Sequence, residues 1–246
     1  MTNLLEMRNF TAGYTSDIDI LQGVDIDVKV GQVVGLIGLN GAGKSTVMKA
    51  ICGFLAPKQG SISIEGKNIT GAQPHEMLSH GVCLIPQESS LFAYMSVEDN
   101  LLMPGEHMLR TGLIDRSTLS DRLEDTYERF PLLRERRKEA AGNFSGGQQK
   151  MLEFAKAYLI KPRLCLIDEP SIGLSPKVAA EVYEWIGLFS RGDMGILLVD
   201  HNIRKVLKMS DFIYVLTLGQ VSAKGGREDF QSDLHDQVRK WMGITF

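Results

Sequence analysis

Two short glycine-containing segments stand at the expected starts of helices, and both have the chemistry of anion-binding sites. GLNGAGKS at 38–45 opens the helical pattern KSTVMKAICGFL, and NFSGGQQK at 143–150 opens the pattern QQKMLEFAKAYLI. Small residues at a helix start leave backbone N–H groups bare and pointing outward, which is how a helix N-terminus binds an anion. The sequence therefore predicts two phosphate-sized anion sites in one chain.

The first segment fits the pattern G-x-x-x-x-G-K-[ST] between a buried strand and a helix. Its glycines allow successive N–H groups to curl around a β-phosphate. Lys44 places a cation on the β- and γ-phosphate oxygens, and the Ser45 hydroxyl can ligate Mg²⁺. A structural glycine-rich turn is the alternative, and the flanking strand and helix argue against it. We interpret the segment as a nucleoside triphosphate site, with binding residues Gly38, Asn40, Gly41, Ala42, Gly43, Lys44, Ser45 and Thr46.

An acidic pair, Asp168 and Glu169, closes the apolar run of LCLIDEP. Ligands of open α/β sheets collect at the carboxyl ends of the strands. An aspartate there can hold the Mg²⁺ shell, and Glu169 would face the γ-phosphate and could polarise an attacking water. In isolation the pair could equally cap the following helix. Beside a phosphate-binding loop it favours nucleotide hydrolysis.

Three further residues carry little weight by themselves. His201 follows GILLVD at the end of a strand, where a lone histidine is more often structural than catalytic. Gln87 follows VCLIP, and a polar residue at a strand end needs no special explanation. Tyr14 lies in the early part of the predicted sheet, where a tyrosine usually packs. A planar ring near a nucleotide could nevertheless stack on its base.

The elements that must position these residues follow from the apolar runs of the chain. LLEMRNF and DIDILQGVDIDVKV predict antiparallel strands with one solvated face. VVGLI, VCLIP, RLCLID and GILLVD predict buried strands that alternate with helices, which implies a parallel sheet covered on both faces. The predicted fold class is α/β: a parallel-sheet core around the phosphate-binding loop (P-loop), an N-terminal antiparallel β layer and an inserted α-helical subdomain.

The predicted boundaries divide one domain, 1–246, into four parts. They are an antiparallel β layer at 1–30 and 60–70, a nucleotide-binding α/β core at 31–59, 71–87 and 160–225, a helical insert at 88–159 and a C-terminal helix at 226–246.

Composition argues against several classes of protein. The net charge of −3 does not suggest nucleic-acid binding, and the basic run at 134–138 is typical of a solvated helix face. Cys52, Cys83 and Cys165 stand apart without C-x-x-C spacing, as expected for reduced thiols of a cytosolic protein. No signal-peptide pattern opens the chain, and no apolar run approaches the roughly 18 residues of a membrane span.

The ordered set Tyr14, GLNGAGKST, Gln87, NFSGGQQ, LCLIDEP and His201 resembles the motifs of the ATP-binding-cassette (ABC) ATPases over essentially the whole chain. The resemblance implies a RecA-like core. In chain order, the motifs are an adenine-stacking aromatic, a phosphate loop, a glutamine loop, the family signature, a Mg²⁺ aspartate with a general-base glutamate, and a switch histidine. The implied catalytic residues are Lys44, Glu169 and His201, and the implied Mg²⁺ ligands are Ser45, Gln87 and Asp168.

The same resemblance gives the second glycine segment a role. In ABC proteins two cassettes pack head to tail, and each signature helix closes over the nucleotide of the partner. The implied contacts with the partner's ATP come from Ser145, Gly146, Gly147 and Gln148. The physics is compatible, because the first cradle saturates its own phosphates and leaves the second helix start free for another γ-phosphate. A serine that merely caps its helix is the plainer alternative.

Finer features are similar to the ATPase subunits of Liv-type importers of branched-chain amino acids. They are FPLLRERRKEAAGNFSGGQQKML, DEPSIGLSP and ITGAQPHEMLSHGVCLIPQ. Ser175 departs from ABC proteins in general, which usually place an aspartate there that communicates across the dimer. Liv-type proteins often have a small residue at this position, so coupling between the two sites stays open.

This resemblance implies a cytoplasmic ATPase attached peripherally to the inner face of the cell membrane. The implied partners are a second ABC ATPase subunit in a homo- or heterodimer, integral-membrane permease subunits and, indirectly, a periplasmic or extracellular solute-binding protein. VDHNIRKVL and VRKWMGI are also similar to the ATPase of lipopolysaccharide export, which is the alternative within transporters. ABC ATPases that act on nucleic acid typically carry a long coiled coil or two cassettes, and neither is present.

Overall fold

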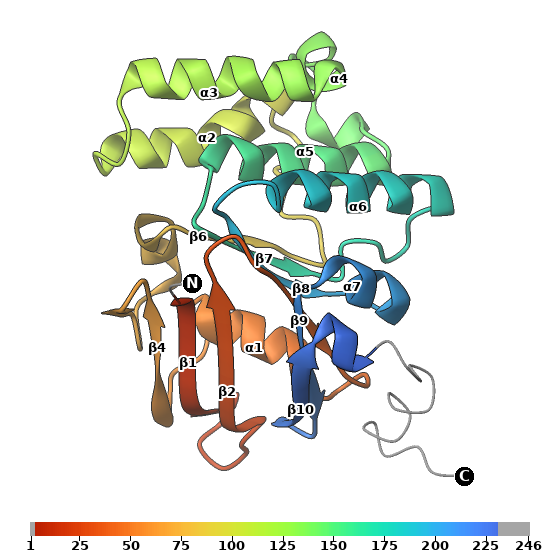
Figure 1. The fold of residues 1–246 in the computed structure, drawn as a ribbon. Helices are drawn as coiled ribbons and strands as arrows, with labels where there is room; N and C mark the ends of the chain where they lie inside the picture. The colour runs from red at the N-terminus through yellow and green to blue at the C-terminus, as the bar shows by residue number, and fades with distance from the viewer. Residues whose placement is uncertain (1–2, 231–246) are drawn as a thin grey trace.

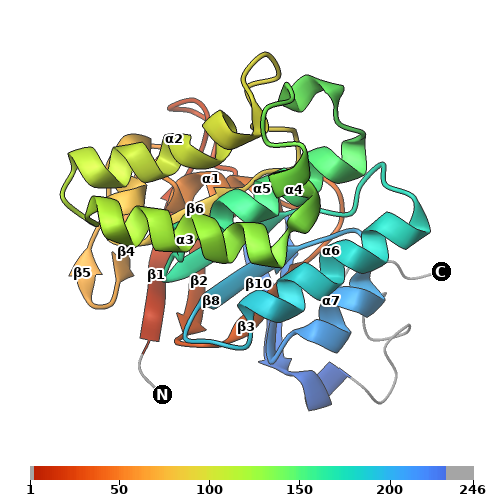
Figure 2. The same cartoon turned by 90° about the horizontal axis from the view of Figure 1, so that it is seen from above.

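The structure is a computed structural model that describes residues 3–230. Two sheets face each other across a helix, and a group of helices covers the far side of the larger sheet (Figures 1 and 2). The smaller sheet is antiparallel, with strand order β2-β1-β4-β5. Its strands are β1 (Asn3–Ala12), β2 (Leu21–Lys29), β4 (Gln59–Ile64) and β5 (Lys67–Asn68).

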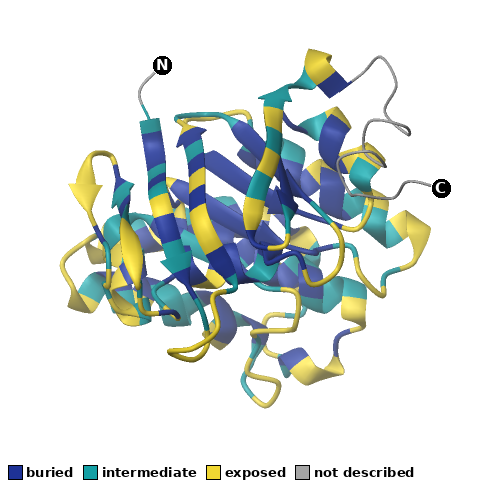
Figure 3. Ribbon diagram, turned by 90° about the horizontal axis from the view of Figure 1, so that it is seen from below, coloured by how far each residue is buried: buried dark blue, intermediate teal, exposed yellow. Residues whose placement is uncertain are grey.

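Buried and exposed residues alternate along β1 and β2, as period 2 requires for a sheet with one solvated face. In Figure 3, dark blue bands alternate with teal and yellow ones along these strands.

The larger sheet has six strands in the order β10-β9-β3-β8-β7-β6. All its pairings are parallel except that of β10 with β9. Every residue of β3, β7 and β8 is buried, which explains their unbroken apolar sequences. The strands are β3 (Val33–Ile37), β6 (Val82–Ile85), β7 (Leu164–Asp168), β8 (Gly195–Val199), β9 (Phe212–Thr217) and β10 (Gln220–Gly226).

Successive residues of β7 point to opposite faces of this sheet and enter two separate cores. Leu164 and Leu166 join the core shared with the antiparallel sheet and α1 (Lys44–Ile51). Cys165 and Ile167 join the core under the remaining helices. The strand is therefore held from both sides, and its carboxyl end is a rigid platform for the acidic pair.

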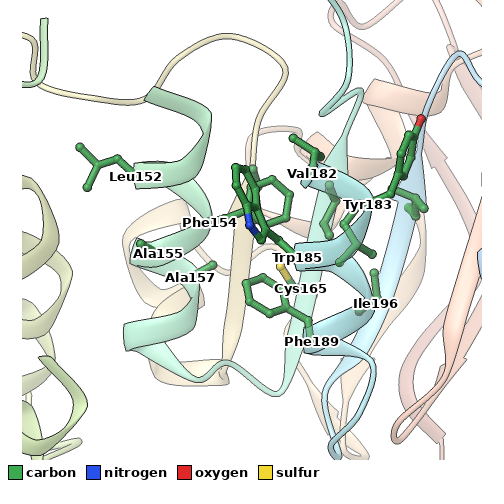
Figure 4. Packing of buried hydrophobic residues seen from close by; sticks show 14 of the residues in the cluster. Leu152, Phe154, Ala155, Ala157, Cys165, Val182, Tyr183, Trp185, Phe189 and Ile196 are labelled. Atoms are coloured by element: carbon green, nitrogen blue, oxygen red, sulfur yellow. The ribbon is translucent and has the colours of Figure 1, made fainter. Parts of the chain in front are cut away.

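The helical insert consists of packed helices on the far side of the larger sheet (Figure 1). Phe154 of α5 lies 5.5 Å from Trp185 and 5.7 Å from Phe189, both of α6, between ring centroids (Figure 4). These rings tie the insert to the core. The α-helices beyond α1 are α2 (Val97–Arg110), α3 (Arg116–Arg129), α4 (Pro131–Glu135), α5 (Gly146–Ile160), α6 (Pro176–Phe189) and α7 (Ile203–Met209). Short 3-10 turns are η1 (Pro74–His80), η2 (Ala141–Asn143) and η3 (Arg227–Phe230).

The structure corrects four details of the sequence interpretation. Tyr14 lies in the loop after β1 rather than within the sheet, because β1 ends at Ala12. β2 begins only at Leu21. The helix after the phosphate loop ends at Ile51, where Cys52 and a left-handed Gly53 stop it. The first helix of the insert starts at Val97, after a segment without helix.

The C-terminal helix expected at 226–246 falls largely on residues 231–246, which lie outside the described part of the chain, as does VRKWMGI. Among residues 3–230, no helix combines the length and the apolar character that crossing a bilayer requires.

Candidate nucleotide site

Four parallel strands deliver the candidate residues to one edge of the larger sheet. β3, β8, β7 and β6 are neighbours and run in the same direction, so the loops after them emerge together. They carry, respectively, the glycine loop at 38–43, His201, Glu169 next to the strand-ending Asp168, and Gln87. Open parallel sheets bind their ligands at this edge.

The glycine loop has a backbone that other residues could not adopt. Gly43 has a φ of 105° at the start of α1, and it provides no side-chain cap for the helix. At Gly38 a Cβ atom would lie 2.3 Å from the carbonyl oxygen of Leu216 in β9. The uncapped first turn of α1 keeps its N–H groups for an anion.

Lys44 is almost buried, and its ammonium is held inside the loop. Nζ donates hydrogen bonds to the carbonyl oxygens of Gly38 at 2.9 Å and Leu39 at 3.0 Å. Burial lowers the pKa of Lys44, while the negative charges of Glu169 and Asp168 oppose that shift. The lysine thus lies between a cradle of N–H groups and two carboxylates.

Asp168 closes β7 with its carboxylate buried. Its Oδ1 atom has no hydrogen-bond partner among the described residues. Burial raises the pKa of Asp168, and the neighbouring Ser45 hydroxyl acts in the opposite direction. A buried carboxylate oxygen without a donor is completed by a cation, and Mg²⁺ typically takes one or two protein oxygens together with substrate phosphates. Ser45 and Asp168 therefore fit a magnesium ion.

Glu169 has a left-handed backbone and a direct contact with His201. Its φ is 48°, a conformation that costs free energy and is found preferentially at functional sites. The Nε2 atom of His201 lies 2.8 Å from Oε2 of Glu169. At this distance Nε2 can donate a hydrogen bond to the carboxylate when that nitrogen carries a proton. In this arrangement His201 can orient the Glu169 carboxylate to accept a proton from a water molecule.

Asp200 fixes the two loops that carry Glu169 and His201, and sequence reasoning missed it. Only 3% of Asp200 is exposed. Its carboxylate accepts hydrogen bonds from the Ser171 hydroxyl at 2.9 Å, the Ser171 N–H at 3.3 Å and the Asn202 N–H at 2.9 Å. The available signal was an acidic residue at a strand end directly before His201.

Most of the candidate residues line an open cleft of about 600 Å³, a size typical of small-molecule sites, but Gly38, Ala42 and Asp168 are not among its lining residues. Gly38 lines an adjoining hollow with Lys44 and His201. Tyr14 stands at the rim of the cleft with 58% of its surface exposed, and Lys49 Nζ lies 5.5 Å from its ring centroid. The candidate residues that the cleft brings together are Tyr14, Asn40, Gly41, Gly43, Lys44, Ser45, Thr46, Gln87, Glu169 and His201.

The second glycine segment is not part of this cleft, since none of Ser145–Gln148 is among its lining residues. Ser145 caps α5: its hydroxyl accepts from the Gln148 N–H at 3.4 Å, and the Gln148 side chain accepts from the Ser145 N–H at 3.0 Å. This cap uses one first-turn donor, so the N–H groups of Gly146 and Gly147 still need partners. A Cβ on Gly146 would meet nothing within 4 Å, so the helix start opens to solvent.

Fold and site together define a P-loop nucleotide hydrolase with an antiparallel β layer and a helical insert. Residues 21–172 match the family described as ABC transporter, and the chain belongs to that family. The ADP conformation of an ATP-binding cassette of an ABC transporter is similar at a TM-score of 0.82 and 30% identity, with 98% of each chain covered. The fold class predicted from the sequence is confirmed.

Relatives of the chain are ATP-binding subunits of transporters. The high-affinity branched-chain amino acid transport ATP-binding protein BraG of Pseudomonas aeruginosa is 36% identical over 208 residues, which are 85% of this chain and 87% of BraG. The probable branched-chain amino acid transport ATP-binding protein LivF of Archaeoglobus fulgidus is 35% identical, covering 98% of this chain and all of LivF. The lipopolysaccharide export system ATP-binding protein LptB of Acidithiobacillus ferridurans is 31% identical, with 95% and 94% covered. The chain is an ATP-hydrolysing subunit of an ABC transporter.

Proposed function

We propose that this chain powers the uptake of branched-chain or similar hydrophobic amino acids. The observation that carries the proposal is the full-length similarity to LivF, together with BraG, both described as branched-chain amino acid transport proteins. The export ATPase LptB remains the second candidate, because its identity of 31% is only slightly lower. Both candidates share the same hydrolytic chemistry and differ in the membrane partner and its cargo.

The chemistry follows from the cleft. The N–H groups of the glycine loop and the Lys44 ammonium bind the phosphates. Ser45, Asp168 and Gln87 would hold Mg²⁺, which would supply positive charge to neutralise the phosphates. Glu169 accepts a proton from the attacking water, and His201 orients its carboxylate through the 2.8 Å contact.

The proposed partners would bind surfaces outside the cleft. The start of α5, residues 145–148, contacts the ATP of a second ATPase subunit, identical or related, packed head to tail. The helical insert at 88–159 contacts integral-membrane permease subunits on the cytoplasmic face of the membrane. A solute-binding protein delivers the amino acid to these permeases from the other side.

The import proposal is tested by uptake of radiolabelled leucine into cells that lack their own branched-chain import ATPases. The chain is supplied with its neighbouring permease genes, and a Lys44→Ala variant is the inactive control. We expect leucine uptake in cells that carry the wild-type chain and none in cells that carry Lys44→Ala. Capture of export-type membrane proteins without leucine uptake would refute import and favour the second candidate.

Tyr14 is expected to stack on the adenine base. Loss of one aromatic stacking contact costs on the order of 1 kcal/mol, so Tyr14→Ala should weaken ATP binding about fivefold. GTP should bind only modestly worse than ATP, because stacking tolerates different bases. The matched control is Tyr94→Ala, since Tyr94 is fully exposed and lies away from the cleft. Calorimetry that finds equal ATP affinity in both variants would make Tyr14 a packing residue.

A further inference from the structure

A buried ion pair on α5 holds the segment that carries Gln87. Lys150 Nζ lies 2.6 Å from Glu153 Oε2, and only 9% and 2% of their side chains are exposed. Both residues lie on α5, while Gln87 belongs to the loop after β6. The pair therefore lies on the helical insert, next to the loop that carries Gln87 into the nucleotide cleft.

Each member of the pair also bonds to the loop backbone. Lys150 Nζ donates to the Pro86 carbonyl oxygen at 3.2 Å. Glu153 Oε1 accepts from the Ser90 N–H at 2.7 Å. Gln87 lies between these two anchors, with only Glu88 and Ser89 beside it. A segment this short, fixed at both ends, has little freedom to move relative to α5.

Stability alone does not account for this arrangement. Removing two charges from water is costly, and replacing a buried pair by apolar groups of similar volume is often neutral or stabilising. The i,i+3 pair of Arg136 and Glu139 offers a comparison, because it is more exposed. Arg136 also donates a hydrogen bond to the Gln148 side chain, only 12 residues away in the chain. The Lys150–Glu153 pair instead joins segments more than 60 residues apart in the chain.

The same helix carries the second glycine segment. Ser145 caps α5, and Lys150 follows five residues later, which is a rise of about 7.5 Å along one helix. One continuous helix therefore connects the anchors of the Gln87 segment to the start of α5.

We infer that Lys150 and Glu153 are positioning residues that set Gln87 in the nucleotide cleft and link it mechanically to the start of α5. The inference rests on the proposed role of Gln87 as a magnesium ligand. Neither residue lines the nucleotide cleft, so both act through the loop between Pro86 and Ser90.

The test compares two double variants of the full chain. Lys150→Met with Glu153→Leu, the Met/Leu variant, fills the same space and removes both anchors. Lys150→Met with Glu153→Gln, the Met/Gln variant, keeps a side-chain oxygen that can accept a hydrogen bond from the Ser90 N–H. Glu65→Gln with Arg163→Gln is the control, because it removes another ion pair that joins distant segments, and this pair lies outside the cleft.

The first readout is local. Hydrogen exchange of the Ser90 amide should accelerate in the Met/Leu variant, recover in the Met/Gln variant and stay unchanged in the control. The second readout is ATP affinity with and without Mg²⁺. Affinity without Mg²⁺ should be unchanged, whereas the gain on adding Mg²⁺ should fall by roughly tenfold in the Met/Leu variant, as expected for lost support of a metal ligand. The Met/Gln variant should regain part of this loss, because it restores the Ser90 anchor but not the contact of Lys150 with Pro86.

Three results would overturn the inference: an unchanged magnesium response in the Met/Leu variant, an equal loss in both variants despite restored Ser90 protection, or failure of both variants to fold. Failure of the wild type to respond to Mg²⁺ would instead refute the proposed chemistry of the cleft.

Discussion

Glu169→Gln is expected to lower steady-state ATP turnover by roughly 100-fold or more, the scale of losing a positioned general base. Glutamine has the same shape as glutamate, so the strained backbone and the contact with His201 can persist. The amide cannot accept a proton from water, while every phosphate contact of the glycine loop and Lys44 survives. Phosphate release measures the turnover, and binding of ATP to the monomer, measured at low protein concentration, should be unchanged.

A Glu169→Asp variant is the matched control for this prediction. Aspartate keeps the base but shortens the side chain, so it should retain more activity than glutamine. Near-normal turnover in Glu169→Gln would remove Glu169 from the chemistry and leave the acidic pair as a structural feature of the strand end.

Ser145→Arg is expected to abolish hydrolysis while sparing ATP binding. The start of α5 lies outside the cleft, so a large side chain there leaves Tyr14 and the glycine loop untouched. It would fill the open space at the helix start and block the approach of a partner's nucleotide. Turnover and ATP affinity, measured on the same preparation, separate the two effects.

Ser96→Arg provides the control for this substitution. Ser96 caps α2 in the way that Ser145 caps α5, accepting a hydrogen bond from an N–H of the first turn. Loss of either cap costs about 1 kcal/mol of stability. Equal hydrolysis in the two variants would reduce the second glycine segment to an ordinary cap. Loss of ATP binding in Ser145→Arg would assign the segment to its own chain's site.

Local patterns made much of the fold and cleft predictable. The P-loop is recognisable from the spacing of its residues alone. β3, β7 and β8 are recognisable as unbroken apolar runs, because strands buried on both faces carry apolar residues at successive positions. The rule that ligands collect at the carboxyl ends of parallel strands predicts a site at Asp168 and Glu169. Gln87 and His201 become candidates only through the resemblance to the ABC family.

The remainder depends on contacts between distant segments. Asp200 acts through Ser171, and Glu153 acts through Ser90, so neither role follows from spacing in the sequence. Tyr14 is expected in the early sheet from its place in the sequence, whereas the chain leaves the sheet after Ala12. The length of a strand is set by the partner strand beside it, which a single sequence does not specify.

The central claim, that the glycine segment of one cassette completes the nucleotide site of another, is tested most directly by light scattering after size exclusion. Glu169→Gln should be a monomer without nucleotide and a dimer with ATP, because the closed dimer forms but does not hydrolyse the ATP that holds it together. High protein concentration is needed if the working partner is a related subunit and the homodimer is weak. Adding Ser145→Arg to Glu169→Gln should return the protein to a monomer that still binds ATP. An ATP-dependent dimer that persists in this double variant would contradict the claim.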